Sequence, residues 1–195
     1  MGLRIESILR RTERVNPSPN DSAEQRALIQ RARAGSPDAL GELYALYAPR
    51  VMAVAFRLTA SVHDAEDVLH DVFLGLPEAL ARSYEEGGRF DAWLRQLAAR
   101  TALTRLRASG RRREVAIASD VAAPAPGAER LGDRVALARA LAQLPDSLRT
   151  VFVLKSVEGY THAEVAAMLG ITEGASEVRL VRAVKRLREL LGGVA

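Results

Sequence analysis

Charged residues of opposite sign collect on two neighbouring segments in the first half of the chain. Residues 61–78 hold five carboxylates, Asp64, Asp67 and Asp71 among them, and no lysine or arginine. Residues 92–113 hold seven arginines and no acidic residue. Carboxylates suit a basic protein partner, whereas a strip of arginines suits a phosphate backbone. The sequence therefore predicts one surface that binds protein and a second that binds nucleic acid.

Two aromatic residues, Phe90 and Trp93, stand at the start of the arginine segment. Aromatic rings stack on unpaired bases, so an aromatic and basic helix is suited to opened DNA. The other interpretation of both residues is a place in the hydrophobic core.

Metal and enzyme chemistry have weaker support. Asp67 and His70 are three residues apart, as ligands in metal-binding helical bundles can be, but His63 and His162 supply no matching second pair. The chain has no HExxH, no GxSxG and no glycine-rich phosphate loop. We expect no metal site, no cofactor, no catalytic residue and no enzymatic activity.

A third candidate site lies near the C-terminus. Thr161 and Glu164 have the spacing of a capping box, which predicts a short helix over 163–169 that Gly170 ends. Thr172 is placed to cap a second helix, for which the expected buried stripe is Leu180, Val184, Leu187 and Leu191. The other faces of that helix carry cations. A short helix, a glycine turn and a longer basic helix predict a helix-turn-helix, whose second helix enters the major groove.

The elements that must position these residues are helices throughout. With 48% hydrophobic and only 5% aromatic residues, the 195-residue chain favours packed helices over sheets. We expect an all-α protein made of two helical domains on a flexible linker. The expected parts are a tail over 1–21, a first domain over 22–107, a linker over 108–132 and the helix-turn-helix domain over 133–195.

Within the first domain, breaker residues divide the helices. Ser36 and Pro37 predict the start of a helix that continues over 39–58, and a second helix follows over 61–74. Pro77 is expected to end or kink that helix, and the pattern resumes over 90–107.

The composition also indicates a compartment. The chain has no cysteine, no apolar run near the ~20 residues of a membrane span, and no signal-peptide pattern at its start. We expect a cytoplasmic protein without membrane insertion. Its net charge of +4 permits a nucleic-acid partner without requiring one.

Three sequence blocks resemble one protein family. Residues 160–174, continuing through Arg182, resemble the −35-reading domain of bacterial RNA polymerase sigma factors, although LuxR/GerE-type regulators share a similar string. Residues 64–74 resemble the sigma segment that grips the coiled coil of the polymerase β′ subunit. Residues 90–107 resemble the segment that melts and reads the −10 element. Their order, without a domain between them, resembles the extracytoplasmic-function (ECF) class of the sigma-70 family.

The resemblance implies a transcription initiation factor and its partners. It implies binding to the β′ and β subunits of core RNA polymerase and to promoter DNA, and regulation by an anti-sigma factor. The alternative is a GerE/LuxR-like helix-turn-helix regulator that acts on duplex DNA without being a polymerase subunit.

The resemblance also assigns three sets of site residues by their positions in the motifs. The core-binding set is Asp64, Asp67, His70 and Asp71. The −10 set is Ser83, Arg89, Phe90, Trp93, Gln96, Arg100, Thr104 and Arg107. The −35 set is Thr161, Gly174, Ser176, Glu177, Arg179, Val181, Arg182 and Arg186.

Overall fold

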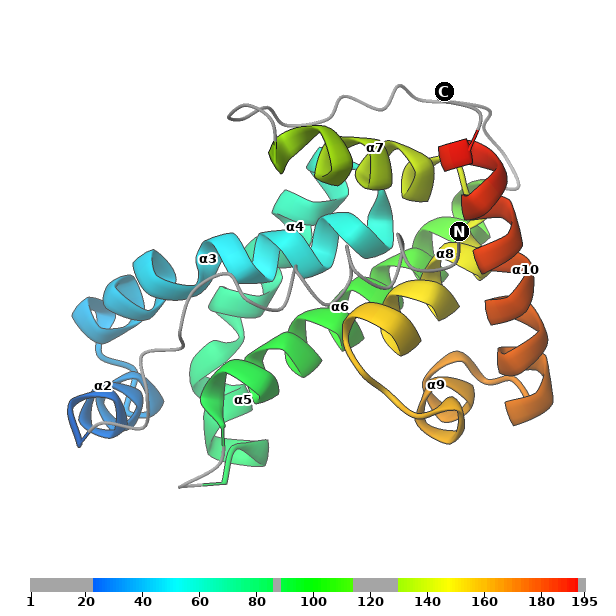
Figure 1. Ribbon diagram of the computed structural model, residues 1–195. Coiled ribbons are helices and arrows are strands. Elements are labelled where there is room, and N and C mark those ends of the chain that lie inside the picture. The colour runs from blue at the N-terminus through cyan, green and yellow to red at the C-terminus, as the bar shows by residue number, and fades with distance from the viewer. Residues whose placement is uncertain (1–22, 86–88, 114–129, 193–195) are drawn as a thin grey trace. The chain divides into compact units, whose positions relative to one another are not determined.

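The computed structural model describes residues 23–85, 89–113 and 130–192, and in these ranges it contains helices and turns without a strand (Figure 1). The prediction of an all-α protein is confirmed. Contacts divide the described residues into two compact units. Of the described residues, the N-terminal unit takes in 23–56 and 63–112, while 57–62 group with the C-terminal unit. Within the described ranges, every helix falls short of the length and apolarity that a bilayer span needs.

Local signals mark several of the ends of the N-terminal helices. They are α2 (Ala23–Arg33), α3 (Pro37–Thr59), α4 (Val62–Leu74), α5 (Leu76–Ser83) and α6 (Phe90–Arg113). Pro37 is the first residue of α3, and the Oγ of Ser36 accepts the backbone N–H of Ala39 at 3.5 Å. Pro77 lies in the first turn of α5, so α4 ends before it. Helix α6 continues to Arg113, six residues beyond the expected end at Arg107.

The core of the N-terminal unit forms between α3, α4 and α6. Leu43, Tyr47 and Val51 are fully buried along one face of α3, as their helical spacing requires. Val68 and Val72 do the same on α4. From α6, the buried residues are Phe90, Leu94, Ala98, Ala99, Ala102 and Leu103.

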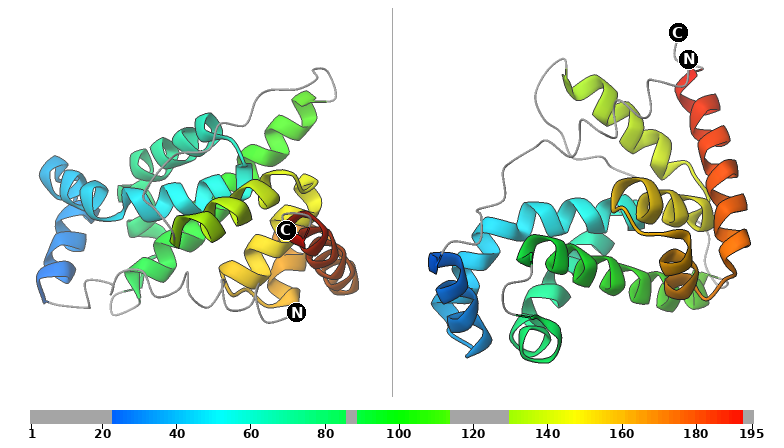
Figure 2. Two further views of the ribbon diagram at one scale, coloured as in Figure 1. Left: turned by 45° about the horizontal axis from the view of Figure 1, so that its top comes forward. Right: turned by 60° about the horizontal axis from the view of Figure 1, so that its bottom comes forward.

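The C-terminal unit is a set of short helices packed against one long one. Its elements are α7 (Arg130–Ala142), α8 (Asp146–Phe152), the π-helical turn η1 (Val153–Val157), α9 (His162–Leu169) and α10 (Glu173–Gly192). Helix α10 packs against α7, α8 and α9. Figure 2 shows the short α9 meeting the N-terminal end of α10 through a tight turn. Pro145, Gly159 and Gly170 lie at the breaks between helices, and Gly170 ends α9 as the sequence predicts.

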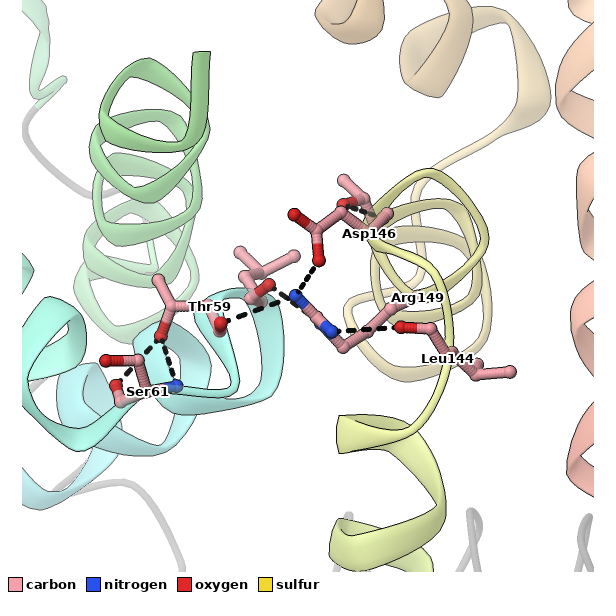
Figure 3. Close-up of polar contacts among 7 residues, drawn as sticks. Thr59, Ser61, Leu144, Asp146 and Arg149 are labelled. Atoms are coloured by element: carbon pink, nitrogen blue, oxygen red, sulfur yellow. Dashed lines mark hydrogen bonds and ion pairs between the residues drawn. The ribbon is translucent and has the colours of Figure 1, made fainter. Parts of the chain in front are cut away.

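A buried arginine ties together the two parts of the C-terminal unit. Arg149 is 3% exposed. Its Nε donates to the carbonyl oxygen of Leu58 at 3.1 Å, and its Nη2 donates to that of Thr59 at 3.3 Å (Figure 3). Nη1 reaches the carbonyl oxygen of Leu144 at 3.1 Å, and Nη2 also pairs with Asp146 at 2.7 Å. The guanidinium thereby supplies donors to carbonyls at a helix end that lack intrahelical partners.

The buried face of α10 differs from the expected stripe. Ser176, Ala183 and Leu187 are buried, whereas Leu180, Val184 and Leu191 are only half-buried. Two of the three buried side chains, Ser176 and Ala183, are small and only weakly hydrophobic. A pattern of large apolar residues therefore does not indicate this buried face. The predicted burial was therefore correct for Leu187 and wrong for Leu180, Val184 and Leu191, which are only half-buried.

The turn between α3 and α4 gives a stability prediction. Ala60 has φ +55°, a left-handed conformation that costs an L-residue about 1–2 kcal/mol. We expect Ala60→Gly to raise the free energy of unfolding by about 0.5–1 kcal/mol, because the relief exceeds the added freedom of glycine in the unfolded chain. Denaturant titration measures the change. The matched control is Ala45→Gly, exposed within α3, which should lower stability by about 1 kcal/mol; a loss at both positions would contradict the prediction.

Candidate functional site

The first candidate surface is the acidic side of α4. Ala65, Val68 and Val72 are buried on one face of this helix. Asp67 and Asp71, one turn apart, keep 39% and 41% of their side chains exposed, so both are accessible to a partner. Of the other expected core-binding residues, His70 is exposed and Asp64 is half-buried.

One arginine from α6 bridges the two exposed carboxylates. The Nη1 of Arg105 lies 2.7 Å from Oδ2 of Asp67, and its Nε lies 2.5 Å from Oδ2 of Asp71. The hydrogen bond with Asp71 is the largest cause of a raised pKa for Arg105. Residues 61–78 contain no lysine or arginine, so α4 receives this cation from another helix. Sequence reasoning counted Arg105 with the basic strip and missed the bridge.

The second candidate surface is the solvent-facing side of α6. The members of the −10 set on this face are Trp93, Gln96, Arg100, Thr104 and Arg107. Their spacing of i, i+3, i+7, i+11 and i+14 places all five on one side of a helix. Trp93 is half-buried and the other four are exposed. Arg105 falls outside this series, and its helical phase is the signal that would have separated it from the strip.

The aromatic pair at the start of α6 divides between core and surface. Phe90 is 1% exposed, and its ring lies edge-on to Tyr47 and Tyr84 at centroid distances of 5.0 and 5.6 Å. Of the two interpretations of Phe90, its burial favours the core, because other rings already cover it. The ring of Trp93 packs against the rings of Tyr84 and Phe90, with centroid distances of 5.2 and 5.7 Å. Part of the Trp93 side chain remains exposed.

The remaining two residues of the −10 set flank the segment before α6. Ser83 ends α5, is exposed, and donates its hydroxyl to the carbonyl oxygen of Ala79 at 3.1 Å. Arg89 is also exposed. Residues 86–88, between Ser83 and Arg89, lie outside the described residues.

The third candidate surface is built on the predicted helix-turn-helix. The Oγ1 of Thr161 accepts the N–H of Glu164 at 3.2 Å, and the carboxylate of Glu164 accepts the N–H of Thr161 at 2.7 Å. This second hydrogen bond is the largest cause of a lowered pKa for Glu164. Gly170 adopts the left-handed conformation at φ +66°, and Thr172 accepts the N–H of Ala175 at 3.1 Å. The capping box, the glycine stop and the second cap are all confirmed.

The outward face of α10 carries half of the −35 set. Gly174, Glu177, Val181 and Arg182 are exposed, and Val181 shows 70% of its surface. Val178 and Lys185 are also exposed on this side and were missed in the site assignment, although their spacing from Val181 places them there.

The other half of the −35 set is less available to DNA. Ser176 is completely buried, and its Oγ lies 2.9 Å from Nδ1 of His162. This burial favours a packing role for Ser176 at the contact of α9 with α10. Arg179 is half-buried, and Arg186 is exposed but pairs with Glu189 at 3.0 Å. Thr161 remains exposed while its hydroxyl caps α9.

No cluster of three or more potential metal ligands occurs in the part of the chain that the structure describes. Asp67 is bridged to Arg105, which gives its carboxylate an ion-pair role.

Comparisons with known proteins identify the family of both halves of the chain. Family models for sigma-70 region 2 and sigma-70 region 4 match residues 43–112 and 134–187. The RNA polymerase sigma factor CarQ of Myxococcus xanthus is 38% identical over 167 residues, which cover 84% of this chain and 95% of CarQ. The ECF RNA polymerase sigma factor SigM of Mycobacterium tuberculosis is 30% identical over 82% of this chain and 80% of SigM. The sigma factor RpoE, solved with the anti-sigma factor NepR from Bartonella quintana, has a TM-score of 0.55 and 28% identity over 80% of this chain and 98% of that one. This chain belongs to the sigma-70 family of RNA polymerase sigma factors, in its ECF class.

Proposed function

We propose that this sigma factor binds core RNA polymerase through α4 and contacts two promoter elements through α6 and α10. The observation that carries the proposal is the separation of charge in the N-terminal unit. The exposed carboxylates of Asp67 and Asp71 lie on α4, whereas the exposed cations Arg100 and Arg107 lie on the outer face of α6. A basic polymerase segment and a nucleic-acid backbone therefore meet different helices.

Promoter opening needs a group that holds bases once they leave the duplex. Extruding a base costs a few kcal/mol, which a binding surface for the extruded strand offsets. Trp93 has a partly exposed indole beside Gln96 and Arg100 on the same helical face, which supports stacking together with backbone contact. Binding energy alone offsets the cost of opening the duplex, so promoter opening needs no enzymatic step by this chain.

The second promoter contact is assigned to α10. Arg182 and Lys185 supply positive charge on its outward side, while Val178 and Val181 supply apolar groups suited to thymine methyls. Glu177 stands on the same side and suits the amino group of cytosine. The GerE/LuxR-like alternative is not favoured, because residues 43–112 match sigma-70 region 2.

An anti-sigma factor is the proposed regulator. The solved RpoE is bound to the anti-sigma factor NepR, and this chain is similar to RpoE over 80% of its length. The acidic surface of α4 and the exposed Leu74 at its end are available to such a partner.

Removing the two carboxylates should weaken binding to core polymerase. For the double variant Asp67→Asn and Asp71→Asn, we expect the affinity for bacterial core RNA polymerase to fall at least about tenfold, because interfacial charge pairs commonly contribute 2–5 kcal/mol. Titration of fluorescently labelled protein with core polymerase measures the change.

The matched control is Arg105→Gln. This variant breaks the same ion pairs within the free protein but keeps both carboxylates, and it should bind core within about threefold of the unmodified protein. An equal loss of core affinity in both variants would mean that the carboxylates act only through their ion pairs with Arg105 and do not contact the polymerase. No loss in the double variant would remove α4 from the core interface.

The two faces of α6 predict different salt dependences for two arginines on one helix. With holoenzyme and a single-stranded −10 non-template oligonucleotide, Arg100→Gln should reduce the slope of log affinity against log salt by about 0.7, the value for one phosphate contact. Arg105→Gln should leave the slope unchanged, because Arg105 faces α4. Fluorescence anisotropy over a salt series tests this, and a slope change in Arg105→Gln as large as in Arg100→Gln would contradict the assignment.

A further inference from the structure

Helix α5 ends against a single arginine of α2. The Nη2 of Arg33, the last residue of α2, donates to the carbonyl oxygen of Leu80 at 3.0 Å and to that of Tyr84 at 2.7 Å. Leu80 is within the last four residues of α5, whose carbonyls have no intrahelical partner, and Tyr84 is the C-cap. The cation also lies at the negative end of the helix. Arg33 thus fixes the point where the chain leaves α5.

The backbone that carries Arg33 is itself held in place. The N–H of Gly35 donates to the carbonyl of Ala32 at 2.9 Å, and the N–H of Ser36 donates to that of Arg31 at 3.0 Å. Gly35 has φ +82°, so the turn has the bonds and the left-handed residue of a Schellman motif. The guanidinium therefore extends from a defined turn.

The carbonyl that Arg33 holds belongs to the residue whose ring supports Trp93. Tyr84 is 8% exposed, and its ring lies edge-on to Trp93 with centroids 5.2 Å apart. Phe90 contacts both rings, at 5.6 Å from Tyr84 and 5.7 Å from Trp93. Since Tyr84 is in extended conformation directly after α5, a shift of its backbone moves its ring away from the indole.

We propose that Arg33 is a positioning residue for Trp93: by holding the Tyr84 backbone, it fixes the indole in the orientation that receives unpaired promoter bases. The role at DNA rests on the proposed function. Arg33 itself does not touch DNA in this arrangement and acts through Tyr84. Its two acceptors are 47 and 51 residues away in sequence, so the contact joins α2 to the start of the −10 surface.

The first experiment uses the free full-length protein. Trp93 is the single tryptophan of the chain, so its intrinsic fluorescence reports this position alone. In Arg33→Ala we expect a red-shifted emission and stronger quenching by acrylamide, because the indole gains exposure to water. Arg33→Lys, which keeps a donor and the charge, should lie between this variant and the unmodified protein.

Arg31→Ala is the matched control. Arg31 stands in the same last turn of α2, is exposed, and contacts Glu42 at 3.5 Å on the surface. Its replacement should leave the Trp93 spectrum unchanged. A spectrum that is also unchanged in Arg33→Ala overturns the proposal.

The second experiment measures promoter opening by the reconstituted holoenzyme. On duplex promoter DNA, Arg33→Ala should reduce open-complex formation about tenfold, because it removes two charge-assisted hydrogen bonds and only part of their free energy acts through Trp93. On the same promoter with a pre-melted −10 bubble, most of the loss should disappear, and core binding should stay at the level of the unmodified protein. A general loss of folding would instead reduce core binding and both templates together, which overturns the positioning role.

The two proposals fail in different ways. Absence of promoter-specific transcription by the unmodified protein with competent core overturns the proposed function and the role of Arg33 at DNA with it. Normal transcription by the unmodified protein, with equal opening of duplex DNA by Arg33→Ala, overturns the role of Arg33 alone.

Discussion

Helix α6 faces the hydrophobic core on one side and solvent on the other. The position of each residue around the helix axis decides which of the two it meets. Leu94, Ala98 and Ala102 bury one side of it in the core of the N-terminal unit. The opposite side exposes Arg100 and Arg107 among the polar residues of the predicted −10 surface. The ordinary period of 3.6 residues thus separates a buried apolar side of α6 from the exposed side that carries the proposed DNA contacts.

Arg105 is in phase with the buried side of α6, seven residues after Ala98, and its ion pairs with α4 change the electrostatics of that helix. Two carboxylates one turn apart repel each other by a few tenths of a kcal/mol, and a cation between them removes that cost. Asp67 and Asp71 share Arg105 at a partly exposed position, where an ion pair contributes at most about 1 kcal/mol. The proposed basic polymerase segment can therefore compete for these carboxylates at low cost.

Sequence reasoning was accurate where the signals are local. Thr161, Glu164, Gly170 and Thr172 each act within four residues of their own position, so their spacing was enough to predict α9, its end and the start of α10. It was less accurate for burial on α10, where the small Ser176 and Ala183 occupy the buried face.

Contacts between distant segments left no local signal at all. Arg33 bonds to carbonyls 47 and 51 residues away, and Arg149 bonds to carbonyls 90 and 91 residues away. Phe90 was open to two interpretations because a buried and a stacking aromatic have the same sequence pattern. Only the rings of Tyr47 and Tyr84, brought together by folding, assign it to the core.

These distant contacts also explain why counting cations overstates the charge available to DNA. Of the 28 cations only Lys155 and Lys185 are lysines, and arginine's forked donors suit it to structural roles as well as to phosphates. Arg149 satisfies three carbonyls, Arg33 satisfies two, and Arg105 pairs with two carboxylates. None of these three is a member of the exposed faces of α6 and α10 that carry the proposed DNA contacts. Under the proposed function, the charge that a promoter meets is therefore determined by the phase of two helices, and a modest net charge of +4 is compatible with cations gathered on one face of each.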